Sequence, residues 1–232
     1  EARYANKGMD LFYRSLNSLL EQALHGCKEY DILPYDRETI GIFLSFSDIA
    51  STHDSWLRIR RLLPHLHSII QNYLDQDMLF GVSGFCYGED EIGTAWEQAI
   101  AMLDRSFLEK RDIFYFDDVR DHYQRKEEVV RELAIQEVRL KEQIIDNRLE
   151  EIREGMQSWC EHIRLSRIAD PGHIKSFCRD IVKLIQVREK TWTDSDIIEK
   201  LEEQETLEET ETLIYAYLEK VLPEGADQNT NW

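Results

Sequence analysis

The sequence predicts an α+β protein in which a small sheet-and-helix domain is followed by an all-α helical module. Short runs rich in β-branched and aromatic residues, bounded by turn residues, precede residue 118. Residues 121–163 then contain no proline, a single glycine and apolar residues at helical spacing. We therefore expect one domain over residues 1–118 and a second over residues 119–232.

The first elements of the chain are expected to be a helix and a hairpin. Residues 9–24 carry one apolar stripe and are followed by Gly26, a pattern typical of an amphipathic helix and its end. The runs 30–33 and 39–46 are β-branched and aromatic, and a polar turn separates them. This arrangement predicts a β-hairpin.

A long helix and a strand–helix–strand segment complete the first half. We expect the helix over residues 54–74, with Asp54 as its N-cap and with Pro64 causing a kink or a join between two helices. The segment is predicted as a strand at 78–86, a helix at 91–108 and a strand at 113–116.

The second half is predicted to contain only helices. Its apolar spacing changes register near residues 145–147, which indicates two helices or one interrupted helix. The apolar stripe is either the core of a bundle within one chain or the seam of a dimer, and the sequence leaves both open. Its residues, which we call the seam, are Val130, Leu133, Leu140, Ile144, Leu149, Ile152, Met156, Trp159 and Ile163, with an interruption at Glu137.

Two further helices have clear start signals. Asp170 followed by Pro171 supplies an N-cap and a proline at the first helical position. Thr206 and Glu209 have the spacing of a capping box, which predicts a final helix over residues 207–222.

Charge and cysteine content exclude some classes of function. The chain has 28 Lys and Arg against 46 Asp and Glu, a formal charge of −18, which argues against direct binding to nucleic acid or an anionic membrane. Residues 119–190 nevertheless hold 15 basic and 14 acidic residues, so this part can self-associate without strong repulsion. Four scattered cysteines without a C-x-x-C pair indicate reduced thiols in a cytoplasmic protein, and no apolar run is long enough to span a membrane.

No catalytic constellation and no cofactor motif stand out, so we expect no enzyme activity. The only notable cationic cluster of the first half consists of Arg58, Arg60 and Arg61. It is a weak candidate for an anion site, and a solvated helix face is the alternative.

One segment resembles the second part of a GGDEF-like domain. It runs from Gly81-Val-Ser-Gly84 through the helix of Trp96 to Phe107 and ends in Asp112-Ile-Phe-Tyr-Phe-Asp-Asp118. The most similar variant is the degenerate form that lies between receiver and DNA-binding domains in AraC-family response regulators of the YesN kind. The helical half resembles the same regulators, in which it precedes a helix-turn-helix module.

The chain departs from active diguanylate cyclases at the hairpin tip. Where they carry two glycines and metal-binding acids, this chain has Pro34 followed by Tyr35, Asp36, Arg37 and Glu38. The family's first strand, with its metal-binding acid, is also missing. Because two-metal phosphoryl chemistry needs both acidic positions, the resemblance implies a degenerate domain without cyclase activity.

The resemblance implies a signal-relay and dimerisation region of a two-component response regulator. It implies a homodimer through the helical region, a sensor kinase acting on a receiver absent from this sequence, and DNA contacts only through an absent helix-turn-helix domain. The alternative is a regulatory domain of GGDEF-like fold that senses a small molecule or nucleotide.

Overall fold

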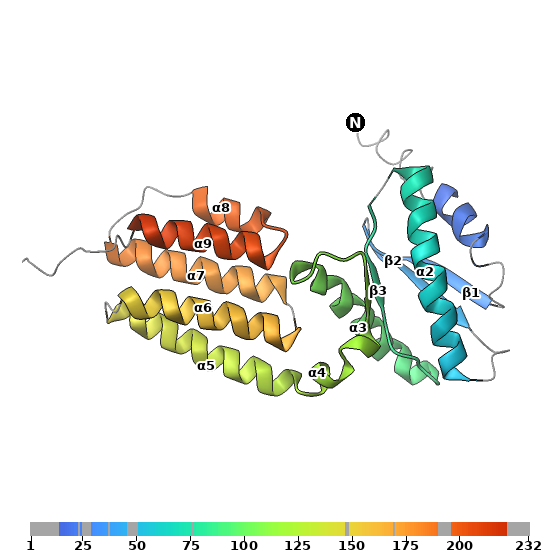
Figure 1. Ribbon diagram of the computed structural model, residues 1–232, viewed down its shortest axis with the longest axis horizontal. Coiled ribbons are helices and arrows are strands. Elements are labelled where there is room, and N and C mark those ends of the chain that lie inside the picture. Colours follow the sequence, from blue (N-terminus) through green and yellow to red (C-terminus); the bar gives the residue numbers. More distant parts are fainter. Residues whose placement is uncertain are drawn as a thin grey trace, which may run out of the picture. The chain divides into compact units, whose positions relative to one another are not determined.

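The computed structural model describes most of the chain in two compact units. They comprise Glu1–Phe80 and Gly81–Trp232, so the change of sequence pattern at Asp118 falls inside the second unit. Helices dominate both units, and two small sheets make the class α+β (Figure 1). The described residues are 14–22, 24, 29–36, 38–45, 51–75, 77–146, 149–168, 170–189 and 196–221.

The first unit contains the predicted hairpin. Strand β1 (Glu29–Pro34) pairs antiparallel with β2 (Ile40–Ser45), and Ile32 lies opposite Ile42. Residues 14–22 are helical and bury Leu16 and Leu20, as the apolar stripe predicts; the ends of the predicted helix 9–24 lie outside the described residues.

Helix α2 (Thr52–Leu74) corrects two predictions. Its N-cap is Ser51 and not Asp54, because the Ser51 hydroxyl accepts a hydrogen bond from the backbone N–H of Asp54. The predicted join at Pro64 is wrong, since the helix continues through this residue. A proline costs a helix one backbone hydrogen bond. The burial of the apolar stripe that includes Leu63 and Leu66 offsets this cost.

The strand–helix–strand segment of the second unit is present but its elements are shorter than predicted. Strand β3 (Phe80–Val82) pairs with β4 (Ile113–Tyr115) in a sheet of its own. Helix α3 (Ile92–Asp104) is flanked by short 3₁₀ turns, Glu89–Glu91 and Arg105–Phe107. The two ladders are therefore separate two-stranded sheets and not one layer.

Gly81 allows β3 to lie directly against α3. A Cβ atom at this position would approach the Ala99 carbonyl oxygen to 2.1 Å and Leu103 Cγ to 3.0 Å. Since the first contact is with helix backbone, it cannot be relieved by turning a side chain. The glycine inside this strand thus reflects close packing, as its position suggests.

The rest of the second unit is a helical bundle. After α4 (Arg120–Gln124), helices α5 (Lys126–Ile145) and α6 (Leu149–Ser166) form the two helices predicted from the register shift. Helix α7 (Pro171–Glu189) packs against α5, and α9 (Leu207–Val221) packs against α6 and α7 (Figure 1).

Local capping confirms both predicted helix starts. The Asp170 carboxylate accepts a hydrogen bond from the N–H of His173 at 2.9 Å. The Thr206 hydroxyl accepts from the N–H of Glu209, and the Glu209 carboxylate accepts from the N–H of Thr206. The break between α4 and α5 was not predicted within the helical stretch that begins at residue 121. Helix α8 (Asp196–Glu203) was not predicted either, because its eight residues give too short an apolar pattern.

The bundle is held by one continuous hydrophobic core. Side chains from α5, α6, α7, α8 and α9 contribute, including Ile144, Trp159, Ile181 and Leu218. Phe107, at the end of α3, is buried in the same core. Among the described residues, no helix combines the length and the apolarity needed to cross a lipid bilayer.

Two glycine substitutions should have opposite effects on stability. We expect Gly81→Ala to destabilise the second unit by about 2 kcal/mol or more, because the new methyl group meets backbone. Gly93→Ala should stabilise it by up to about 1 kcal/mol, since nothing lies within 4 Å of the new Cβ in α3 and alanine favours helix. Urea unfolding of both variants measures the difference, and equal midpoints would contradict the close packing at Gly81.

Candidate functional site

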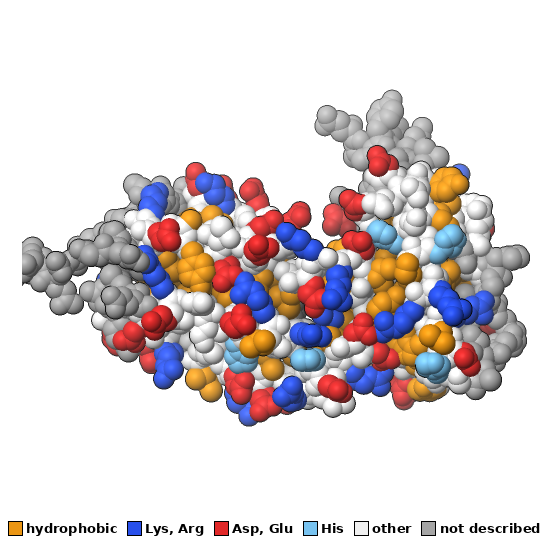
Figure 2. Space-filling model, viewed as in Figure 1, with side chains coloured by type: hydrophobic (Ala, Val, Ile, Leu, Met, Phe, Trp, Pro, Cys, Tyr) orange, Lys and Arg blue, Asp and Glu red, His pale blue; other side chains and the backbone are white. Residues whose placement is uncertain are grey.

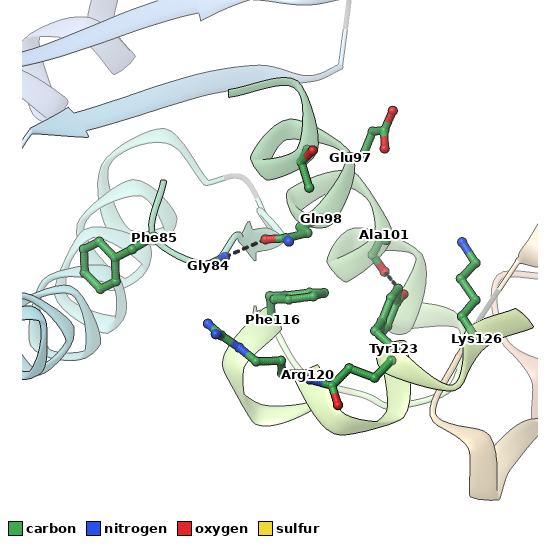
Figure 3. A pocket seen from close by; sticks show the side chains of 11 residues that line it. Gly84, Phe85, Glu97, Gln98, Ala101, Phe116, Arg120, Tyr123 and Lys126 are labelled. Carbon is green, nitrogen blue, oxygen red and sulfur yellow. Dashed lines mark hydrogen bonds between the residues drawn. The ribbon is translucent and has the colours of Figure 1, made fainter. Parts of the chain in front are cut away.

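A pocket lies where the end of β3, helix α3 and helix α4 meet within the second unit. Its volume is about 460 Å³. The lining comes from the segment after β3, from one face of α3, from Phe116 after β4, and from α4 with the first residue of α5 (Figure 3). The lining residues are Gly84, Phe85, Thr94, Glu97, Gln98, Ala101, Phe116, Arg120, Tyr123, Gln124 and Lys126.

Two hydrogen bonds and an aromatic pair fix the walls of the pocket. The N–H of Gly84 donates to the Gln98 side-chain oxygen at 2.9 Å, and the Tyr123 hydroxyl donates to the Ala101 carbonyl at 3.4 Å (Figure 3). The rings of Phe116 and Tyr123 pack edge to face, with centroids 5.4 Å apart. These contacts join the segment after β3 to α3, α3 to α4, and the turn after β4 to α4.

Two cations lie over the aromatic rings. The Arg120 guanidinium lies 6.0 Å from the Phe116 ring centroid and forms an ion pair with Asp117. The Lys126 ammonium lies 5.8 Å from the Tyr123 ring centroid. Glu97 is the only acid of the lining, and its side chain is turned away from Phe116 and Tyr123 (Figure 3).

The chemistry of this lining suits the binding of a small ligand. It has flat aromatic surface, side-chain amides and two cations, which can hold a small polar ligand. It contains no histidine, cysteine or serine, and Glu97 is its single carboxylate.

A half-buried carboxyl group, that of Asp104 at the end of α3, interacts electrostatically with two residues of the pocket lining. Burial raises the pKa of Asp104, and the charge of Asp170 raises it further, whereas Lys126 opposes both effects. Burial likewise raises the pKa of Tyr123 to about 12, with a further contribution from the charge of Asp104. The two groups are thus electrostatically coupled across the wall formed by α3 and α4.

Most residues of the seam pack within the bundle of their own chain. Leu140, Ile144, Ile152, Met156, Trp159 and Ile163 are all buried in the bundle core, and Leu133 packs against it. Val130 is exposed, and the side chain of Leu149 lies outside the described set. The arrangement favours the intramolecular interpretation of the seam over the dimeric one.

Glu137, which interrupts the seam, has a structural partner in the core. Its carboxylate accepts a hydrogen bond from Trp159 Nε1 at 3.3 Å and lies 2.8 Å from His173 Nε2. The Trp159 ring is fully buried and packs 4.6 Å from the Phe177 ring centroid. The acid therefore satisfies the only polar atom of a buried tryptophan side chain.

At the hairpin tip, the carboxylate of Asp36 stabilises the turn. The Asp36 carboxylate accepts hydrogen bonds from the N–H groups of Glu38 at 2.8 Å and Thr39 at 2.7 Å. The hydrogen bond from Glu38 is the main reason that the pKa of Asp36 lies below its ordinary value. Tyr35 is exposed, and Arg37 lies outside the described residues.

The three arginines of the weak anion candidate do not converge. All lie on α2, where successive residues turn by about 100°, so Arg58 and Arg61 share a face that excludes Arg60. The Arg60 guanidinium lies 5.7 Å from the Trp56 ring centroid, one turn away. The structure therefore does not bring the three together.

The pocket was missed by sequence reasoning because its residues carry no motif. The GGDEF-like resemblance covers the 81–84 turn, the following helix and residues 112–118 with Phe116, but it does not point to a pocket or to the lining residues of α4. Within the described ranges, no group of three or more His, Cys, Asp or Glu side chains could hold a metal ion. Burial raises the pKa of the Cys160 thiol to about 12, so this residue is not a reactive nucleophile.

Comparisons with models of protein families, with curated proteins and with solved structures find no significant match for this chain.

Replacing Asp104 should change the pH dependence of stability. A raised pKa means that the folded state holds the proton to higher pH than the unfolded state. Stability therefore falls as pH rises from the ordinary Asp value of 3.8 through the folded pKa. We expect Asp104→Asn to match the wild type at low pH and to be more stable near neutral pH.

The same variant should lower the pKa of Tyr123, because the charge of Asp104 contributes to raising it. Urea unfolding at several pH values and NMR of the tyrosine ring carbons measure the two effects. A variant less stable than the wild type near neutral pH, with an unchanged Tyr123 pKa, would contradict the assignment.

Glu137 should be required as a hydrogen-bond acceptor more than as a charge. Glu137→Ala leaves Trp159 Nε1 without its acceptor in a buried position, so we expect a loss of about 1–3 kcal/mol. Glu137→Gln keeps an acceptor oxygen and should recover at least half of that loss. Equal destabilisation by both variants in urea unfolding would show that the charge is what matters.

Proposed function

We propose that this chain is the signal-relay and dimerisation region of a two-component response regulator that controls transcription, of the AraC-family, YesN kind. In this proposal a receiver precedes the chain, a helix-turn-helix module follows it, and the protein works in the cytoplasm. The chain itself carries no enzyme activity. Residues 1–118 correspond to a degenerate GGDEF-like domain, and the bundle passes the signal on.

The observation that carries the proposal is the direct link from the pocket segment to the bundle. Arg120 and Tyr123 of α4 and Lys126 of α5 line the pocket. From Lys126 the same helix continues to Leu140 and Ile144 in the bundle core, with only Arg125 separating it from α4. A displacement of α4 is therefore transmitted to a core helix.

A second link supports the same conclusion. Phe107 ends the 3₁₀ turn that follows α3 and is buried in the bundle core with Leu140 and Ile181. The strand–helix–strand segment is thus attached to the bundle at two points, through Phe107 between α3 and β4 and through α4 after β4. Packed elements of this kind switch between arrangements and do not deform continuously, which suits a relay.

The absence of facing carboxylates in the pocket lining and the use of Asp36 in the turn support a role without catalysis. Incubation with GTP and Mg²⁺ is expected to give no product. Turnover by the purified chain, abolished by substitution of a pocket residue, would overturn this part of the proposal.

The complete coding sequence tests the proposed class. We expect an aspartate-bearing receiver before Glu1 and a helix-turn-helix module after Trp232. A metabolic enzyme domain or a membrane anchor in either place would contradict the proposal.

Lengthening the joint between α4 and α5 should uncouple the relay. In the full-length regulator, two glycines inserted between Arg125 and Lys126 are expected to abolish most of the phosphorylation-dependent activation of a reporter gene. The reason is that α5 no longer follows α4.

The matched control is the same insertion between Lys110 and Arg111, two exposed residues of a turn. This variant should keep most of the activation, and circular dichroism should show both variants folded. Full activation with the insertion between Arg125 and Lys126 would contradict the proposed relay through α4.

The pocket favours a second candidate, a regulatory domain that senses a small molecule or nucleotide. Its two cations and aromatic rings suit a planar or anionic ligand. A thermal-shift screen with nucleotides and sugars tests it, with Lys126→Ala as the variant that should lose the shift. The absence of stabilisation by every compound would count against this candidate.

A further inference from the structure

We propose that a second copy of this chain binds to the outer face of α5, in antiparallel orientation, and that this face is the dimer interface. The outer face is defined here by the exposed apolar residues of α5: Val130, Ala134, Ile135, Val138 and Ile145. The inference rests on the dimerisation part of the proposed function and gives it a location and a geometry.

The outer face carries apolar side chains along the length of the helix, with the charged side chains of Glu127, Arg131 and Glu142 between them. Val130, Ile135, Val138 and Ile145 are 52%, 65%, 58% and 69% exposed. With about 100° between successive residues, Val130, Ala134, Val138 and Ile145 fall within one sector of the helix, and Ile135 borders it. Isolated apolar residues on a surface need no explanation, but a stripe along one helix indicates a binding surface.

The stripe lies opposite the side of α5 that enters the bundle. Leu133, Leu140 and Ile144 point into the core, about half a turn away from Val138. Helix α5 therefore carries apolar side chains on two sides, of which the described residues of the second unit cover only one. Figure 2 shows hydrophobic side chains among the charged ones along the rim of the bundle where α5 lies in Figure 1.

The buried seam cannot serve as the interface while the bundle is folded. Met156 and Trp159 are fully covered by their own chain, so a partner could reach them only by opening the core. A dimer formed by folded chains needs another apolar face of sufficient length, and α5 supplies one of 20 residues, about 30 Å.

The charges on this face select a second copy in antiparallel orientation. Arg131 and Glu142 are both exposed on the same side as the stripe. In an antiparallel pair centred on Val138, Arg131 of one copy lies within one turn of Glu142 of the other, and the symmetry repeats this pair. A parallel pair would instead place Arg131 opposite Arg131 and Glu142 opposite Glu142.

Two further features agree with self-association. The near balance of charge over residues 119–190 keeps the excess negative charge of the chain, −18 in total, away from the proposed interface. Ala134, a small residue between the larger ones, permits the close approach of a facing helix. Since the interface has the width of a single helix, we expect a dimer that dissociates on dilution.

Analytical ultracentrifugation over a range of concentrations tests the inference on the full chain. The wild type should pass from monomer to dimer as concentration rises. Val138→Arg should weaken dimerisation at least tenfold, because it places two like charges at the centre of the pair. The control is Val187→Arg on α7, since Val187 is 61% exposed and lies off the stripe; it should dimerise as the wild type does.

Charge exchange tests the orientation. Arg131→Glu and Glu142→Arg should each weaken the dimer, and the double variant should restore it, because the pair is re-formed with its signs reversed. Single variants that dimerise normally, or a double variant weaker than both, would contradict antiparallel pairing. Circular dichroism and urea midpoints equal to those of the wild type establish that each variant is folded.

The outcomes separate this inference from the proposed function. A dimer that survives Val138→Arg overturns the α5 interface and leaves dimerisation itself in place. A wild type that stays monomeric at every concentration overturns both the interface and the dimerisation part of the proposed function. The relay through α4 is then still decided by the insertion between Arg125 and Lys126.

Discussion

The burial of Trp159 is the constraint on which the bundle depends. Its ring is fully enclosed and packs against Phe177 of α7, while its N–H is satisfied by Glu137 of α5. One side chain of α6 thus fixes the spacing of three helices by apolar packing and by a hydrogen bond. Because α5 also extends to Lys126 beside the pocket, the position of the pocket wall depends on this same core.

The elements that the sequence predicted correctly have local causes. The Thr206–Glu209 box and the Asp170–Pro171 pair determine helix starts through hydrogen bonds made within a few residues, so their spacing alone reveals them. The N-cap of α2 is decided just as locally, but Ser51 and Asp54 are both residue types that favour this position, so the sequence does not choose between them. The continuation of α2 through Pro64 depends instead on longer-range packing of its buried stripe. An eight-residue helix such as α8 gives too little periodicity to be recognised.

The candidate site was less accessible from the sequence. An apolar stripe predicts that a helix face is buried, but it does not identify the element that buries it. The contacts of Met156 and Trp159 in the structure are what distinguish a bundle core from a dimer seam. In the sequence Glu137 only interrupts the apolar seam, whereas in the structure it accepts the hydrogen bond of the buried Trp159. The pocket joins residues as far apart as Gly84 and Lys126, a proximity that no local pattern encodes.

These observations place apolar side chains on two sides of α5, one built into the core and one offered to a second copy. The most direct test is oxidative cross-linking of Val138→Cys chains in which Cys27 and Cys86 are replaced by serine. A residue at the two-fold axis meets its own copy, so we expect rapid formation of a disulfide-linked dimer and little from a matched Val187→Cys chain. Equal cross-linking at both positions, or none at residue 138, would contradict the account.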